Sequence, residues 1–228
     1  MTRSVSYEKM RSAPPQPPHA TAAIPLALER TVARSATAKT ESTDGRVERS
    51  RRNRKAIVEA LYELISEGEL LPTGDQVATR AGVGLRTVFR HFEDMESLHS
   101  EVSSRLARVI VPLLATPIAQ GDLAERVGAL VQQRADAFER MAPFMRSGEI
   151  QRWRSSFLQD SHAETVRHLR TNLRNVLPEI ETLPVPIAQV VELLASYEAW
   201  DRLRSHQGLG RERAAEAVRC SLLVLLQA

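Results

Sequence analysis

The chain has 228 residues, of which 43% are hydrophobic and 26% are charged, a composition that suits one or two globular units with a sizeable core. A single cysteine excludes an internal disulfide framework and a multi-cysteine zinc site, and it favours a reducing cytoplasm as the setting. No apolar run approaches the roughly 20 residues that span a bilayer, and the segment "AAIPLAL" is too short for a signal peptide. We therefore expect a cytoplasmic protein without a membrane partner.

Charge is distributed unevenly along the chain. The formal net charge is +3, but residues 1–55 hold 12 basic and 5 acidic side chains, whereas residues 56–228 hold 19 and 23. A basic front joined to a mildly acidic body indicates a polyanionic partner near the N-terminus. The stretch "APPQPPHA" and its Ser/Thr/Ala-rich surroundings have no sustained apolar period, so we expect residues 1–47 to be a disordered basic extension.

A helical period follows the basic run "RVERSRRNRK" at 46–55. Apolar residues recur there at the spacing of one helix face before Gly68, a stop signal; they are Ile57, Ala60, Leu61, Leu64 and Ile65. The sequence "TGDQ" at 73–76 has the Thr-x-x-Gln form of a capping box and opens a second, short helix. Gly82 supplies the positive φ that a sharp turn needs. Two short helices joined by such a turn predict a helix-turn-helix.

The stretch "GVGLRTVFRHF" at 82–92 combines apolar and cationic residues in a way that neither a buried helix nor a solvated loop would. We interpret residues 85–91 as the second helix of the pair, held by Val88 and Phe92. Its other face would present Arg86, Arg90 and neighbouring polar groups to the major groove of DNA, where arginine pairs with guanine. An ordinary amphipathic helix with a solvated basic face is the alternative for this stretch taken alone.

The region from 48 to 110 resembles the DNA-binding domain of the TetR family of transcriptional regulators. The resemblance is carried by "RRNRKAIVEALYELISEGELLPTGDQVATRAGVGLRTVFRHFEDMESL", in which the family pattern matches Val77-Ala78, Ala81-Gly82-Val83, Thr87, Val88, Phe89 and His91-Phe92. It implies an all-α protein with an N-terminal three-helix DNA-binding domain at 48–110, whose helix-turn-helix motif spans 73–92. It also implies a C-terminal helical domain at 111–228 that binds an effector and dimerises, so that a homodimer binds a palindromic DNA operator.

The resemblance and the basic lead-in together predict the DNA-contacting residues. These are Arg51, Arg52, Arg54, Thr73, Leu85, Arg86, Thr87, Phe89, Arg90 and His91. Three positions depart from the family pattern. Gly84 replaces a Ser or Thr N-cap and lacks a side-chain acceptor, Phe89 replaces a tyrosine, and Met95 replaces a lysine that commonly opens the fourth helix. Because all three changes remove hydrogen bonds, we expect the arginines of 49–55 to compensate through phosphate contacts.

The body of the chain predicts further helices. One stripe at helical spacing comprises Leu123, Val127, Leu130, Arg134, Phe138 and Met141, and another comprises Val166, Leu169, Leu173 and Leu177. Soft and aromatic side chains that could line an adaptable ligand pocket are Phe138, Met141, Phe144, Met145, Trp153 and Phe157. Side chains of this kind more often form plain core, and the sequence leaves both interpretations open.

The last two predicted helices, at 186–205 and 211–226, are apolar on more than one face. A surface helix of a monomer needs only one apolar face, so we expect these two helices to form a homodimer interface. They also resemble the C-terminal helices of TetR-type proteins. Two fully buried helices in a monomer are the alternative.

These features favour a ligand-responsive transcriptional regulator, and a repressor in particular, released from DNA by a small apolar or amphipathic effector. The sequence has no Gly-x-Ser-x-Gly, no phosphate-binding glycine loop and no spaced set of metal ligands. We therefore expect no catalytic activity, no cofactor and no metal. Two alternatives stay open: a non-catalytic DNA-binding regulator without an effector, and an all-α enzyme.

Overall fold

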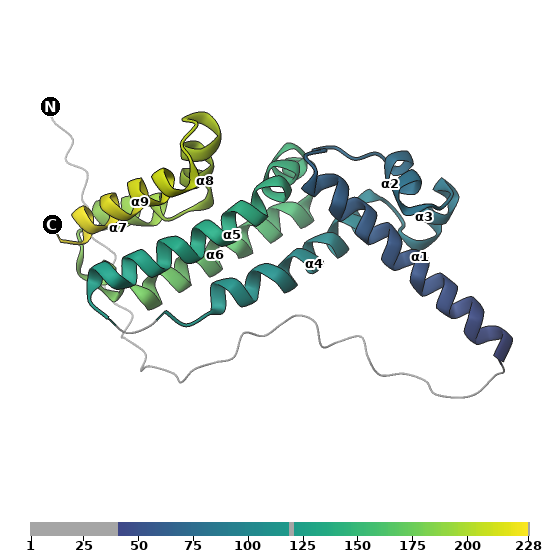
Figure 1. Ribbon diagram of the computed structural model, residues 1–228, viewed down its shortest axis with the longest axis horizontal. Helices are drawn as coiled ribbons and strands as arrows, with labels where there is room; N and C mark the ends of the chain where they lie inside the picture. The colour runs from purple at the N-terminus through teal and green to yellow at the C-terminus, as the bar shows by residue number, and fades with distance from the viewer. Residues whose placement is uncertain (1–40, 119–120, 228) are drawn as a thin grey trace, which may run out of the picture. The chain divides into compact units, whose positions relative to one another are not determined.

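The computed structural model describes residues 41–118 and 121–227, and every regular element in these ranges is a helix (Figure 1). The predicted all-α fold class is therefore confirmed. Most of the expected N-terminal extension lies outside the described residues. Its last part, 41–47, belongs to the first helix.

The described helices follow one another with short connections. In chain order they are α1 (Glu41–Ser66), α2 (Gly74–Ala81), α3 (Leu85–His91), α4 (Met95–Ala115), α5 (Leu123–Arg152), α6 (Ser156–Val176), the 3₁₀ turn η1 (Pro178–Thr182), α7 (Val185–Leu194), α8 (Tyr197–Asp201), the π-helical turn η2 (Arg202–His206) and α9 (Arg211–Leu226). Local signals set several boundaries. Asp94 and Asp122 cap α4 and α5 through reciprocal bonds with Ser97 and Glu125, which satisfy otherwise unpaired helix-end amides.

The buried apolar residues from 57 onward form two hydrophobic cores. The N-terminal core gathers the apolar faces of α1 to α3 and the start of α4: Ile57, Val58, Ala60, Leu61, Leu64, Ile65, Val77, Ala78, Val88, Phe92, Leu98 and Val102. The C-terminal core is larger and begins at Ile110 on the same α4. The boundary expected near residue 110 thus falls inside a continuous helix that both cores share.

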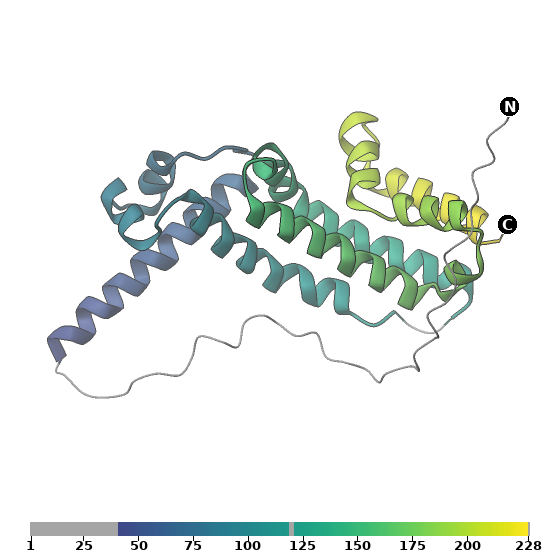
Figure 2. The same cartoon turned by 180° about the vertical axis from the view of Figure 1, so that it is seen from behind.

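The C-terminal core is built around α5, which contacts α4, α6, α8 and α9. Figure 2 shows α6 lying alongside α5. The predicted stripe on α5 is buried from Val127 to Met141, and the same core contains Leu169 and Leu173 of α6 and Leu177, which follows it. The periodicity in the sequence therefore identified the buried faces of both helices.

The single helix expected at 186–205 is wrong. The chain forms α7, α8 and η2 there, because α7 ends at Leu194 and Ser196 starts a new helix by accepting a hydrogen bond from the Ala199 amide at 3.2 Å. An N-cap of this kind fixes a helix start locally. A similar restart occurs at Ser155, which caps α6, so Trp153 ends α5 and Phe157 lies on α6.

The turn at Gly82 gives a test of backbone strain. Its φ of 65° lies in the left-handed region, where an L side chain costs roughly 1–2 kcal/mol, and a Cβ there would meet nothing within 4 Å. We expect Gly82→Ala to lower the free energy of unfolding in urea by about that amount. Gly128→Ala is the matched control, because Gly128 has equally open surroundings inside α5 and alanine should add roughly 0.5–1 kcal/mol there. Equal changes at the two sites would contradict the strain argument.

Candidate nucleic-acid interface

The α2–turn–α3 unit is fixed by its own backbone. The Thr73 hydroxyl accepts a hydrogen bond from the Gln76 amide at 3.3 Å, and the Gln76 side chain accepts one from the Thr73 amide at 2.7 Å. This is the predicted capping box. At the other end, Gly82 adopts the left-handed conformation and the Val83 amide donates to the Ala78 carbonyl at 3.0 Å. The predicted helix-turn-helix is therefore present from residue 73 to residue 92.

Helix α3 spans Leu85–His91, as predicted, and is anchored on one side only. Val88 and Phe92 are almost completely buried in the N-terminal core. Arg86 and Arg90 are exposed, and within the part of the chain that the structure describes neither has a hydrogen bond or an ion pair. The helix thus presents two free guanidinium groups one turn apart, about 6 Å along its axis.

Leu85 and Phe89 form a half-exposed apolar edge of α3 that rests on α2. A Cβ at Gly74 would lie 3.1 Å from Leu85 Cδ1 and 3.2 Å from Phe89 Cζ, which is tighter than ordinary van der Waals contact. Glycine at the first position of α2 therefore lets α3 pack closely. No sequence pattern indicates this role of Gly74, because the contact joins residues that are eleven or more positions apart.

His91 and Thr87 are partly buried. Burial lowers the pKa of His91, and the neighbouring Arg90 and Arg54 lower it further. His91 is consequently neutral near pH 7. Its Nε2 is buried without a hydrogen-bond partner, so His91 does not add a third exposed cation to α3.

Arg54 lies in a different environment from the other predicted phosphate contacts. It donates to the His91 carbonyl at 3.1 Å and to a Glu101 carboxylate oxygen at 2.5 Å, and its guanidinium lies 4.4 Å from the centre of the Phe92 ring. It therefore ties α1 to the end of α3 and to α4. Arg51 and Arg52 are exposed, and Arg51 pairs with Glu48 one turn away, an arrangement that contributes little at a solvated surface.

Contacts also join the N-terminal core to the helices that follow. Arg105 of α4 donates to Glu59 of α1 at 2.6 Å and lies 3.7 Å from the centre of the Tyr62 ring. The Tyr62 ring lies 4.8 Å from that of Phe144 on α5, and Ser155 hydrogen-bonds Glu96 near the start of α4. The position of α1 and α4 is thus coupled to α5 by direct side-chain contacts.

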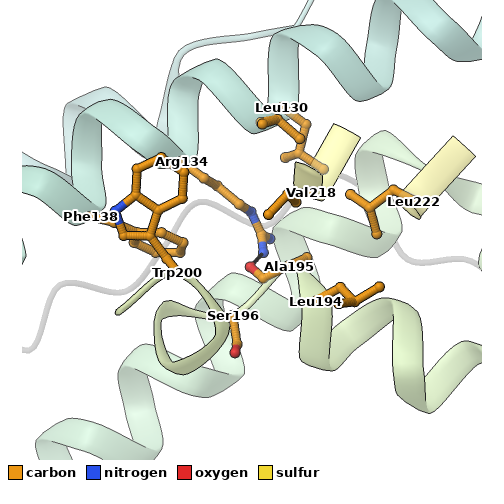
Figure 3. Close-up of a pocket in the computed structure, with 10 residues that line it drawn as sticks. Leu130, Arg134, Phe138, Leu194, Ala195, Ser196, Trp200, Val218 and Leu222 are labelled. Atoms are coloured by element: carbon orange, nitrogen blue, oxygen red, sulfur yellow. Dashed lines mark hydrogen bonds between the residues drawn. The ribbon is translucent and has the colours of Figure 1, made fainter. Parts of the chain in front are cut away.

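The six residues expected to line a ligand pocket do not surround one cavity. Phe138 and Met141 are buried in the C-terminal core, and Met145 packs at its edge. Phe144 packs on the N-terminal core instead, Trp153 is 69% exposed, and Phe157 is partly buried. The cavity shown in Figure 3 shares only Phe138 with this set; its other lining residues are Leu130, Val131, Arg134, Leu194, Ala195, Ser196, Trp200, Val218 and Leu222.

Comparison with solved structures identifies the fold. A transcriptional regulator from Rhodococcus sp. Rha1 superposes with a TM-score of 0.59 at 22% identity, covering 78% of this chain and 96% of that one. A protein named as a TetR-family transcriptional regulator from Mesorhizobium loti gives 0.54 at 16% identity, with coverages of 78% and 97%. The chain has the fold of TetR-family transcriptional regulators. The resemblance noted from the sequence is therefore confirmed at the level of the fold.

A third structure with this TetR-type fold, a protein named as a transcriptional regulator from Streptomyces coelicolor A3(2), gives a TM-score of 0.53 at 22% identity and covers 73% of this chain and 96% of that one. No family model and no curated protein matches the sequence. Among the described helices, none is long and apolar enough to cross a membrane.

The contacts of Arg54 predict that it acts on stability. Arg54→Ala should lower the free energy of unfolding by about 1–2 kcal/mol, because two hydrogen bonds from the guanidinium and a cation–π contact are lost at a half-exposed site where water screens part of them. Arg52→Ala is the control and should change stability by less than about 0.5 kcal/mol. Chemical denaturation of both variants measures this difference. Equal free energies of unfolding for the two variants would show that Arg54 has no structural role.

Proposed function

We propose that the chain is a DNA-binding transcriptional regulator that acts as a homodimer on a palindromic operator. The observation that supports this most directly is α3, a short helix with a buried anchor on one side and two unpaired arginines on the other. A helix of this kind fits the major groove, which is about 12 Å wide. A guanidinium fork matches the two acceptors on the major-groove edge of guanine, so Arg86 and Arg90 are the base-reading candidates.

The remaining predicted contacts divide by their surroundings. Arg51 and Arg52 are exposed on the part of α1 that precedes the N-terminal core, where they can meet phosphates without disturbing packing. Arg54 acts indirectly, by holding the end of α3 against α1. Thr73, Leu85, Thr87, Phe89 and His91 are the remaining candidates around the two arginines.

A second copy of the chain is the partner proposed for α7 and α9. These helices pack against each other, yet α7 leaves Val190 and Leu193 exposed, the latter by 58%, and α9 leaves Val224 exposed by 68%. Exposed apolar side chains on two neighbouring helices favour an interface, and two-fold pairing is the usual way to cover them. A two-fold dimer also presents two copies of α3 to the two halves of a palindrome.

We further propose that an effector bound in the C-terminal body releases the protein from DNA, so that the regulator is a repressor. The support is α4, whose first turns pack in the N-terminal core and whose later turns pack in the C-terminal core. Because helices are stiff, a change in the packing around Ile110 shifts the start of α4 and the groups bound to it. The spacing of two α3 helices in a dimer is sensitive to such a shift.

Selection of operators from random DNA tests the roles of Arg86 and Arg90. If either arginine reads a guanine, its replacement by alanine should relax the preference at one symmetric pair of positions, worth roughly 1–3 kcal/mol of discrimination. The affinity for random DNA should change little. Arg52→Ala is the control, which should weaken binding to every duplex and lower the slope of log affinity against log salt by about 0.9. An unchanged consensus in both α3 variants would show that base reading lies elsewhere.

The proposed interface predicts a change of assembly state. Leu193→Glu and Val224→Arg place charges on the exposed face of α7 and α9, so each should give a folded monomer that no longer binds an operator tightly. Sedimentation equilibrium and circular dichroism report the two properties. Val111→Arg is the matched control, since Val111 is an exposed valine on α4. Dimers that persist in both interface variants would place the interface on another surface.

A further inference from the structure

Arg134 is the most deeply buried charged side chain among the described residues. It lies in the middle of α5, is 4% exposed, and is surrounded by the C-terminal core. Its guanidinium lines the cavity between α5, the α7–α8 junction and α9, next to apolar groups that include Leu130, Trp200 and Leu222 (Figure 3). An arginine in such surroundings needs a specific reason, because arginine is almost never fully buried without a partner of opposite charge.

Arg134 has no such partner. It donates to the backbone carbonyl oxygens of Ala195 and Leu169, the latter at 2.6 Å, and makes a long contact of 3.5 Å with the side-chain oxygen of Asn172. Its Nε is buried without an acceptor. No carboxylate of the described chain lies within ion-pairing distance of it, since no salt bridge includes it.

The other arginines of the same body show the contrast. Arg126, Arg146, Arg174 and Arg204 each pair with a carboxylate, and the hydrogen bond to that carboxylate raises the pKa of each guanidinium. Burial lowers the pKa of Arg134 to about 10, so it is still cationic near pH 7. The C-terminal core therefore encloses one positive charge that no anion of the described chain neutralises.

We propose that Arg134 is the recognition group for an organic monoanion, a carboxylate carried on an apolar tail, and that this compound is the effector of the regulator. The identification of this compound as the effector rests on the proposed function, whereas the binding of a carboxylate at Arg134 does not. A guanidinium fork binds a carboxylate through two parallel hydrogen bonds. One guanidinium neutralises one charge, which favours a carboxylate over a phosphate dianion. The apolar lining, with Phe138 and Trp200, suits a hydrocarbon or aromatic tail.

The cavity must open for such a ligand to enter. Its volume of about 10 Å³ has room for no more than about one water molecule. Ala195 and Ser196 form the junction between α7 and α8, and the Ala195 carbonyl already occupies one face of the guanidinium. A carboxylate takes the place of that carbonyl, so binding separates the α7–α8 junction from α5. In the closed arrangement, a weaker, neutral acceptor holds the guanidinium at the position of the anion.

Capping of α7 is the competing explanation for Arg134. A cation near a helix C-terminus is stabilising, and Ala195 is the residue that ends α7. A neutral amide would serve that purpose without the cost of burying a charge. The two explanations differ in what they predict for added carboxylates, because a capping arginine has no need of an anion.

Calorimetry on the full chain without DNA decides between them. The probes are octanoate and phenylacetate, each compared with its matched alcohol, 1-octanol and 2-phenylethanol. We expect at least one carboxylate to bind about 10- to 100-fold more tightly than its alcohol, the range that a hydrogen bond to a charged group provides. Arg134→Gln should abolish this preference. Arg126→Gln, a paired arginine on the same helix, is the control and should retain it.

Arg134→Lys is the second variant, in case Arg134→Gln does not fold, because lysine keeps the charge but lacks the guanidinium fork. It should bind the carboxylate about tenfold more weakly than the wild type, with binding of the alcohol unaffected. The proposal is overturned if neither carboxylate binds more tightly than its alcohol, or if the preference survives in Arg134→Gln or is undiminished in Arg134→Lys. Binding to a selected operator, measured separately without any probe, tests the proposed function. A protein that binds DNA but shows no preference for carboxylates would therefore contradict only the identification of the effector.

Discussion

The shared helix α4 is the constraint on which the arrangement of the molecule depends. Its early residues Leu98 and Val102 are buried with α1, α2 and α3, and Ile110 is buried with α5. Two cores that share one helix cannot shift independently, because the helix transmits displacement along its axis. The side-chain bonds of Arg105 and Arg54 to neighbouring elements reinforce this, since each joins α1 to α4. The position of α3 is thus set by residues that are far from it in sequence.

Helix α3 itself has little to stabilise it. Seven residues form less than two full turns, and isolated helices of that length are marginal in water. Its stability comes from two buried side chains, from the close contact of Phe89 with Gly74, and from the bond between Arg54 and the His91 carbonyl. None of these contacts involves Arg86 or Arg90 themselves. The two exposed guanidinium groups are consequently free of structural contacts within the described chain.

The sequence predicted the elements whose determinants are local. The capping box at Thr73, the positive φ at Gly82 and the burial of Val88 and Phe92 each depend on residues within one or two turns. It did not predict the break at Ala195–Ser196, since the apolar pattern runs through it and a serine cap is a weak signal inside such a pattern. It also missed the cavity, whose lining comes from α5, α7, α8 and α9. Residues that meet only in the folded chain leave no spacing for a sequence pattern to reveal.

The surroundings of Arg134 connect the buried charge to helix α4. Asn172, which lies beside Arg134, also donates its side-chain amide to the carbonyl of Leu114 at the end of α4, at 3.3 Å. Helix α4 therefore has one end within two side chains of the buried charge and the other end in the core that carries α3. A contiguous set of contacts is not by itself evidence of energetic coupling. It does, however, give an anion at Arg134 a direct physical route to α4. Rearrangement of the guanidinium removes the donor that contacts the Asn172 side-chain oxygen, and Asn172 is bonded to the helix that both cores share.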